Sequence, residues 1–509
     1  MAKLPTPSDW TSELIEQYYL EIERIARDVF KLDTYPNQIE IISSEQMMEA
    51  YSSVAMPVMY DHWSFGKQFL HTFNNYKKGR MGLAYEVVIN SSPCIAYLME
   101  ENTMLMQALV MAHACFGHNA VFKNNYLFKQ WTDAEGIIDY LIFAKKYIRQ
   151  CEEKYGDEEV EKVLDSCHAL MNYGVDRYKR PSKLSAEEEK KRMDQRREYR
   201  REQVNELWRT IPNQGKKDNE RVEKRFPEEP QENILYFIEK NAPHLETWKR
   251  EIIRIVRKVS QYFYPQKQTK VLNEGYATFM HYNIMHEMKA QGLIDDKFML
   301  EFYHMHTGVV AQPSYQYSSS INVYALGFAI FQDIKRICMD PTDEDREWFD
   351  FAGNGDWLKT TDWAMRSFKD ESFILQFLSP KVIRDLGLFV LMDDEQDDEY
   401  EITAIHNKKG YKRVREVLAK QFDITTYEPV IQVYSVDIRG DRSLTLHHNV
   451  SDTEQLLDQD STEEILKHIQ TLWQFNIHIE EIYNDEIVNS YSTDSGDLEG
   501  LYDMFSSIQ

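Results

Sequence analysis

Two histidines and a distant glutamate are the residues of this sequence best suited to hold a metal ion. His113 and His118 lie five positions apart in the apolar stretch 105–119, which reads LMQALVMAHACFGHN. Glu274 lies near the start of a second helical pattern at 271–282, VLNEGYATFMHY. Catalytic zinc sites use neutral imidazole nitrogens and carboxylate oxygens, usually three protein ligands and a water. The three side chains therefore predict a zinc site, provided that the two stretches meet.

The spacing of the two histidines decides whether they can share one ion. Residues five apart on an ideal α-helix point about 140° away from each other. Both imidazoles can face one ion if the helix ends or bulges between them, and Gly117 offers a helix terminator at that place. In the alternative arrangement, His113 points into the core and His118 only caps the helix.

Glu274 is followed by Gly275, which allows another segment to approach this helix closely. The stretch 273–277, NEGYA, resembles the helix from which several zinc-peptidase families take their third ligand. Those families usually carry a glutamate directly after the first histidine, where it acts as general base. Here that position is Ala114, so the usual HExxH glutamate is missing.

A general base therefore has to come from elsewhere, or the site binds metal without peptidase chemistry. The candidate catalytic carboxylates are Glu100 and Glu101, with Glu86 as a third candidate.

Further histidines compete for ligand roles. His281 follows Glu274 by about two helical turns and falls on the same helix face, while His304 and His306 could add ligands or support them. For each of these histidines, the alternative is a hydrogen-bonded structural residue.

Helical periodicity dominates most of the chain. Residues 8–395 are expected to form a mainly α-helical large domain with a zincin-like, metallopeptidase-related core and 105–119 as its central helix. Extended segments are expected at 36–42 and 85–89. The insertion 181–230 is almost entirely charged and polar, so we expect a solvated helix followed by a flexible excursion.

The pattern changes near residue 399. The strand-like segments are 400–405, 430–438, 444–448 and 475–483. Helices are expected at 411–422 and after Ser461, which opens a capping box. This βαββαβ order is that of a ferredoxin-like α+β module, so we predict a small C-terminal domain at 399–484. An acidic, flexible tail is expected at 485–509.

Bulk composition excludes several classes of protein. A formal net charge of -25 argues against sequence-independent binding to nucleic acid or to anionic membranes. The five cysteines form no CxxC pair, as expected in a reducing compartment. The N-terminus has no apolar leader, and no apolar run reaches the ~18 residues of a membrane span. These features predict a cytoplasmic protein.

Several longer stretches carry a resemblance to a known family. They are 33–36 (DTYP), 62–66 (HWSFG), 97–102 (YLMEEN), 111–118, 172–178 (NYGVDRY), 263–266 (FYPQ), 273–275, 327–328 and 439–444 (RGDRSL). On these residues the chain resembles the SpoVR (stage V sporulation protein R-like) family over nearly its whole length, and its enterobacterial-type members in particular. The resemblance implies a role in forming the spore cortex, a peptidoglycan layer, or a stationary-phase or stress role in bacteria without spores. It also implies a PrkA-type serine kinase as partner and a smaller C-terminal domain.

Two functions follow as hypotheses. The first is a metal-dependent hydrolase acting on a peptide or a peptidoglycan-related substrate, with His113, His118 and Glu274 as zinc ligands. The second is a non-catalytic regulatory or scaffold protein that works with the kinase. Ala114, the charged insertion and the C-terminal module favour the second hypothesis, and the metal-ligand pattern favours the first.

Overall fold

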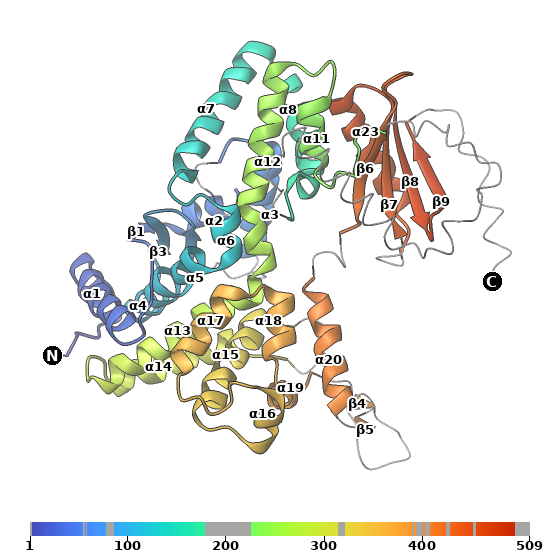
Figure 1. The fold of residues 1–509 in the computed structure, drawn as a ribbon. Coiled ribbons are helices and arrows are strands. Elements are labelled where there is room, and N and C mark those ends of the chain that lie inside the picture. The colour runs from blue at the N-terminus through green and yellow to red at the C-terminus, as the bar shows by residue number, and fades with distance from the viewer. Residues whose placement is uncertain are drawn as a thin grey trace, which may run out of the picture. The chain divides into compact units, whose positions relative to one another are not determined.

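The chain forms two compact units, each assembled from two stretches of sequence. The computed structural model describes residues 3–53, 56, 59–77, 86–178, 225–313, 321–388, 391–392, 401–402, 408–423, 428–450 and 455–493. The large unit consists of Met1–Leu164 and Lys258–Glu428, and the small unit of Asp165–Arg257 and Pro429–Gln509. Figure 1 shows the elements of both. The expected insertion 181–230 lies mostly outside the described residues.

The large unit is mainly helical, as the sequence predicted. Its helices are α1 (Ser12–Asp28), α2 (Ser44–Ser52), α3 (Trp63–Lys77), α4 (Met104–Met111), the π-helix η1 (Ala112–His118), α5 (Asn119–Asn124), α6 (Tyr126–Trp131), α7 (Ile137–Tyr155), α13 (Lys270–Ala290), α14 (Asp296–Val309), α15 (Val323–Met339), α16 (Asp343–Trp348), α17 (Trp357–Ser367), α18 (Asp370–Phe377), α19 (Pro380–Asp385) and α20 (Lys408–Gln421). Two further helices, α8 (Asp157–Ala169) and α12 (Thr247–Gln268), contain residues of both units.

A three-stranded sheet accompanies these helices in the order β1-β3-β2. Strand β1 (Asn37–Ile42) runs parallel to β3 (Cys94–Met99), and β2 (Glu86–Ile89) runs antiparallel to β3 with Glu86 opposite Leu98. The sequence predicted β1 and β2 but not β3. Its short apolar run directly precedes an apolar helix, and periodicity alone does not separate the two.

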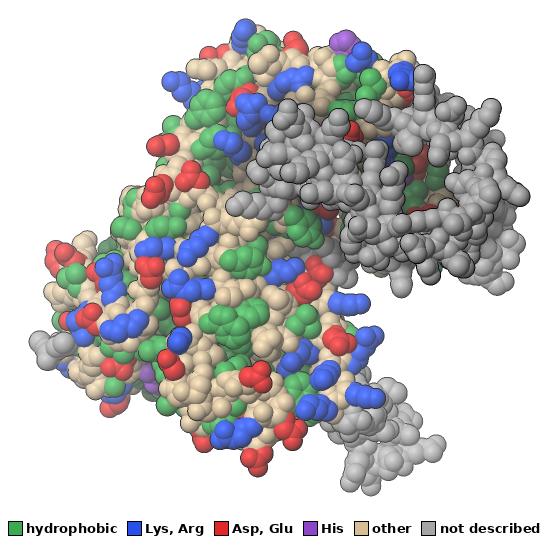
Figure 2. Space-filling view, in the orientation of Figure 1, with side chains coloured by type: hydrophobic (Ala, Val, Ile, Leu, Met, Phe, Trp, Pro, Cys, Tyr) green, Lys and Arg blue, Asp and Glu red, His purple; other side chains and the backbone are tan. Residues whose placement is uncertain are grey.

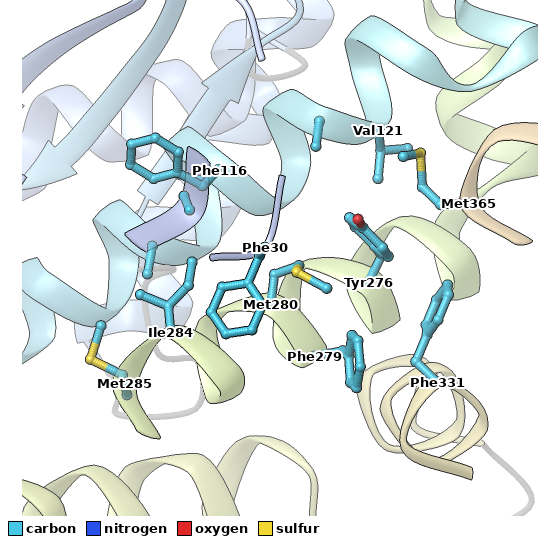
Figure 3. Close-up of a cluster of buried hydrophobic side chains, with 14 of the residues drawn as sticks. Phe30, Phe116, Val121, Tyr276, Phe279, Met280, Ile284, Met285, Phe331 and Met365 are labelled. Atoms are coloured by element: carbon cyan, nitrogen blue, oxygen red, sulfur yellow. The ribbon is translucent and has the colours of Figure 1, made fainter. Parts of the chain in front are cut away.

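The core of the large unit lies where η1 and α15 pack against α13. Figure 3 shows Phe116 of η1 beside α13, and Tyr276 and Phe279 of α13 facing Phe331 of α15. The ring centroids of Phe331 lie 5.2 Å from Tyr276 and 5.8 Å from Phe279. All four rings are almost completely buried, so α13 is the central helix of this core.

Two glycines allow α13 and α15 to approach each other closely. A Cβ atom added to Gly275 would lie 2.4 Å from Cα of Gly327 on α15. No side chain fits between backbones at that separation, so both positions require glycine. The close approach predicted for Gly275 is thus present, with α15 as the partner.

The small unit contains a four-stranded sheet in the order β6-β7-β8-β9. Its elements are η2 (Met171–Gly174), α11 (Ile234–Asn241), β6 (Ile431–Val436), β7 (Leu444–Asn449), α23 (Gln459–Trp473), β8 (Ile477–Tyr483) and β9 (Glu486–Ser492). Strands β7 and β8 are parallel and joined through α23, whereas the β6–β7 and β8–β9 pairs are antiparallel. Trp473 of α23 is buried and donates its indole N–H to the carbonyl of Arg442 at 2.9 Å.

The predicted ferredoxin-like order βαββαβ is wrong. The described residues of the first strand-like segment form β5 (Glu401–Ile402), which pairs with β4 (Leu391–Met392) in a separate ribbon. Helix α20 buries Leu418 and Ala419 in the core of the large unit, and its Arg415 donates to the carbonyl of Leu375 in α18. Both elements lie within Lys258–Glu428 and thus belong to the large unit, where α20 buries its apolar residues.

The segment directly after Asn484 also differs from the expectation. The predicted flexible tail 485–509 begins with strand β9, which pairs with β8 from Glu486 opposite Tyr483. Tyr491 of this strand is buried, which explains why the segment is ordered. Residues 494–509 lie outside the described part of the chain.

Side chains of both charge signs lie on the surface of the described part of the chain (Figure 2). Figure 2 shows Lys and Arg side chains interspersed with Asp and Glu over the face in view. Among the described helices, none combines the length and apolarity needed to cross a bilayer.

Candidate metal centre

The two histidines of the apolar stretch lie on a π-helix. Helix α4 continues without interruption into η1 and then into α5, with αR backbone angles at both junctions. The N–H of Asn119 donates to the carbonyl of Ala114, an i→i+5 bond that defines the wider π turn. This wider turn brings His113 and His118 to the same face, and their ring centroids lie 4.5 Å apart at an interplanar angle of 86°. The bulge that the spacing required is therefore present.

Gly117 has a different role from the one predicted. It does not terminate the helix, because η1 runs on into α5. A Cβ atom on Gly117 would lie 2.5 Å from Cα of Ala277 on α13. The glycine therefore lets η1 pack directly against α13, within one turn of Glu274.

The position of Glu274 is fixed at the N-terminus of α13. The buried carboxylate of Asp370 accepts hydrogen bonds from the backbone N–H groups of Val271 at 2.9 Å and Leu272 at 2.8 Å. These donors are among the four that a helix leaves unpaired at its N-terminus. The two hydrogen bonds to Asp370 fix the first turn of α13. Gly275, the residue directly after Glu274, packs against Gly327 of α15.

Four side chains converge at this place. Oε2 of Glu274 lies 3.6 Å from Nε2 of His113 and 3.5 Å from Nε2 of His118, and Oε1 of Glu86 lies 3.5 Å from Nε2 of His113. Ligand atoms in a tetrahedral zinc site are about 3.3 Å from one another, given metal–ligand bonds of about 2.0–2.1 Å. The three distances are close to this value, so each of the two histidines lies at ligand spacing from Glu274, and His113 lies at the same spacing from Glu86.

The second nitrogen of each imidazole has a partner of its own. Nδ1 of His118 lies 3.0 Å from Oδ1 of Asn273, and Nδ1 of His113 lies 3.0 Å from Nδ1 of His281. Metal-binding histidines almost always use one nitrogen for the ion and the other for such a hydrogen bond. Both Nε2 atoms are therefore directed at the carboxylates.

One oxygen of the cluster lacks a hydrogen-bond partner. Within the described residues, Oε2 of Glu274 is buried and accepts no hydrogen bond, because its distances to both imidazoles are long. Tyr324 also lies near this carboxylate and contributes to lowering its pKa. An unpaired carboxylate oxygen is costly to bury, whereas a cation bound there would satisfy it. The donor set thus fits a divalent metal.

The protonation states agree with this chemistry. Burial, with a smaller contribution from His118, lowers the pKa of His113 to about 4, so its imidazole is neutral at neutral pH, as a ligand must be. Burial raises the pKa of Glu274, but His118, His113 and Tyr324 outweigh this effect and the net pKa is lowered. Burial and the nearby charge of Glu274 raise the pKa of Glu86 to about 8.

The structure brings some of the remaining predicted residues to the site and leaves others outside it. His281 and His306 are buried behind His113 and do not share the space between the carboxylates. His304 is exposed on α14. Glu100 and Glu101 are exposed in the turn after β3, where Trp10 donates to the carbonyl of Glu100.

The carboxylate beside the histidines is instead Glu86. Glu86, His113 and His118 each offer a ligand atom, and these atoms lie within 4.8 Å of one another. The sequence named Glu86 only as one of three candidates, because its position depends on the pairing of β2 with β3. Cys115, between the histidines, is buried, and burial raises the pKa of its thiol well above the usual value, so it is an inert thiol.

Comparison with known proteins places the chain in a family. The sequence model of "SpoVR like protein" matches residues 9–427, and that of the "SpoVR-like C-terminal domain" matches residues 429–484. The chain is 59% identical over 485 residues to the protein named "Uncharacterized protein YcgB" of Escherichia coli (strain K12), covering 95% of this chain and 94% of that protein.

The boundary between the two matches coincides with the division between Glu428 and Pro429 in the structure. No solved structure matches the chain, so a zincin-like relationship of its core stays a prediction. The family itself is shown by matches that together cover most of the sequence, and the chain belongs to the SpoVR-like proteins.

Proposed function

We propose that this protein is a metal-dependent hydrolase with zinc held by His113, His118 and Glu274. The observation that carries the proposal is the convergence of both Nε2 atoms on one buried carboxylate oxygen that has no hydrogen-bond partner among the described residues. Two imidazoles and a carboxylate are a known ligand set of catalytic zinc.

Glu86 is the residue that we propose as general base. Zinc at this site would supply Lewis acidity that activates a water molecule for attack on a carbonyl carbon. Glu86 reaches the site from β2, with Oε1 3.5 Å from Nε2 of His113. A general base must lie within reach of the proton that it takes, and the carboxylate of Glu86 lies beside the proposed zinc position. Its carboxylate would take the proton from water and pass it to the leaving group.

The proposed substrate is a peptide or a peptidoglycan-related amide. Its support is the family's implied role in cortex formation together with the resemblance of 273–277 to the third-ligand helix of zinc peptidases. A kinase of the PrkA type, the role in sporulation or stress and the cytoplasmic location stay predictions from the sequence.

Metal content tests the proposal. Full-length protein purified without chelator, and reloaded with Zn²⁺ after dialysis, should contain about one zinc per chain by elemental analysis. His113→Ala and His118→Ala should each lose most of this zinc. The matched control is His304→Ala, which removes an exposed imidazole outside the cluster and should retain the wild-type content. Wild-type protein without stoichiometric metal, or a zinc content indifferent to His118→Ala, would contradict the proposal.

A further inference from the structure

Three buried imidazoles form a hydrogen-bonded chain that leads away from the candidate site. Nδ1 of His113 lies 3.0 Å from Nδ1 of His281, and Nε2 of His281 lies 3.1 Å from Nδ1 of His306. His281 belongs to α13 and His306 to α14, and both are at most 4% exposed.

Aromatic rings shield this chain from water. Phe302 stacks on His306 at a centroid distance of 5.5 Å and packs edge-on against His281 at 6.0 Å. Phe328 packs edge-on against His306 at a centroid distance of 4.8 Å. Hydrogen bonds between buried groups are strong, and a mismatched pair is costly because water cannot replace the missing partner.

The geometry allows only two arrangements of protons when all three imidazoles are neutral. In each hydrogen bond, one nitrogen must carry a proton and the other must offer a lone pair. If Nε2 of His113 offers a lone pair to a metal, its proton is on Nδ1 and points at His281. His281 must then donate from Nε2 to His306, whose own proton is on Nε2. If Nε2 of His113 is protonated instead, the whole order reverses.

We infer that His281 and His306 are positioning residues that fix the nitrogen with which His113 binds the metal. The inference rests on the proposed zinc site and assigns these two histidines a role other than that of ligands. Both nitrogens of His281 are engaged by neighbouring imidazoles, so the residue transmits the proton order from one end of the chain to the other.

Zinc affinity of His281 variants tests this inference. His281→Leu removes both hydrogen bonds, and loss of such a supporting contact typically weakens metal binding by about 10- to 100-fold. His281→Asn keeps an acceptor oxygen near the position of Nδ1 and should restore binding to within a few-fold of wild type. Dissociation constants for Zn²⁺ would be measured on the full chain by competition with a chromophoric chelator. Thermal melting would show whether each variant folds.

A second variant and a spectroscopic measurement keep the test decisive if His281→Leu does not fold. His306→Leu touches no proposed ligand and should also weaken zinc binding. Nitrogen-15 NMR of histidine-labelled, zinc-loaded protein should show His281 and His306 protonated at Nε2. A purely structural role of these two histidines would not require this tautomer.

The outcomes separate this inference from the zinc site itself. If wild type and His281→Leu bind zinc equally tightly, or if zinc-loaded His306 is protonated at Nδ1, the inference is overturned and the zinc site stands. If wild-type protein binds no zinc, both are overturned.

Discussion

His113 and His118 face each other across one turn of π-helix, with ring centroids 4.5 Å apart. On an ideal α-helix, the same five-residue spacing would turn them about 140° apart. The wider turn is therefore the local feature that makes a shared ligand position possible. Glu274 completes the arrangement because η1 packs directly on α13 at Gly117 and Ala277.

Gly117→Ala should destabilise the protein and weaken zinc binding. The new Cβ would lie 2.5 Å from Cα of Ala277, so the two helices would have to separate. Overpacking of this kind costs about 1–3 kcal/mol. Thermal or urea unfolding measures the stability, and chelator competition measures the zinc affinity.

Gly66→Ala is the matched control for this prediction. Gly66 lies in α3, and a Cβ there would meet nothing within 4 Å. Because alanine favours the helix over glycine by about 1 kcal/mol, this variant should be as stable as wild type or more so. Equal stability of the two variants would show that the η1–α13 contact tolerates a side chain.

The sequence predicted the ligand pair and Glu274 because local patterns carry that information. His113 and His118 stand out in an apolar stretch, and Glu274 lies in a short stretch that resembles a known ligand helix. The sequence alone could not place Glu86 beside His113. Glu86 lies on β2, and the strand that pairs with β2, which is β3, was not recognised. Gly117 was interpreted by its local helix-ending tendency, whereas the tertiary contact with Ala277 determines its role.

Glu86→Gln should strongly slow hydrolysis while leaving the zinc content unchanged. The amide keeps the size of the side chain but cannot take a proton from water, and loss of a general base typically costs about 10²- to 10⁴-fold in rate. Activity would be followed with a fluorogenic peptide library and zinc by elemental analysis. Glu100→Gln, in the exposed turn after β3, is the control and should retain activity. Loss of zinc from Glu86→Gln would instead make Glu86 a ligand.

Asp345 should make stability depend on pH in acid. Burial raises the pKa of this carboxyl, but hydrogen bonds from Arg336 and Thr342 outweigh it and bring the pKa down to about 2. Arg336 binds both carboxylate oxygens, at 2.6 and 2.8 Å. Because the folded pKa lies below the unfolded value near 4, the stabilisation is present above pH ~4 and is lost as the pH falls towards 2.

The size of this effect is about 2 kcal/mol, from the difference between the two pKa values. Urea unfolding of wild type and Asp345→Asn between pH 5 and pH 2, in steps of about 0.5, would measure it. The variant should be less stable at pH 5 and should show a smaller loss towards pH 2. Asp296→Asn, at a position whose side chain is 97% exposed, is the control. Parallel pH profiles for wild type and Asp345→Asn would contradict the assignment.

The C-terminal fold shows where sequence patterns stop being informative. Residues 411–422 were correctly expected to be helical, but an amphipathic pattern does not specify which core its apolar face joins. Leu418 is buried in the large unit instead of covering the C-terminal sheet. Strand β9 was missed because only one of its residues, Tyr491, is buried, so the segment carries little apolar alternation.

The central claim is that His113, His118 and Glu274 hold one metal ion, and locating that ion tests it most directly. Crystals of zinc-loaded, full-length protein would be measured at the zinc absorption edge. We expect one anomalous peak between Nε2 of His113, Nε2 of His118 and the Glu274 carboxylate, at about 2.0–2.2 Å from each ligand atom. A zinc-loaded crystal with no peak between these three side chains, or with its only strong peak elsewhere, would contradict the account.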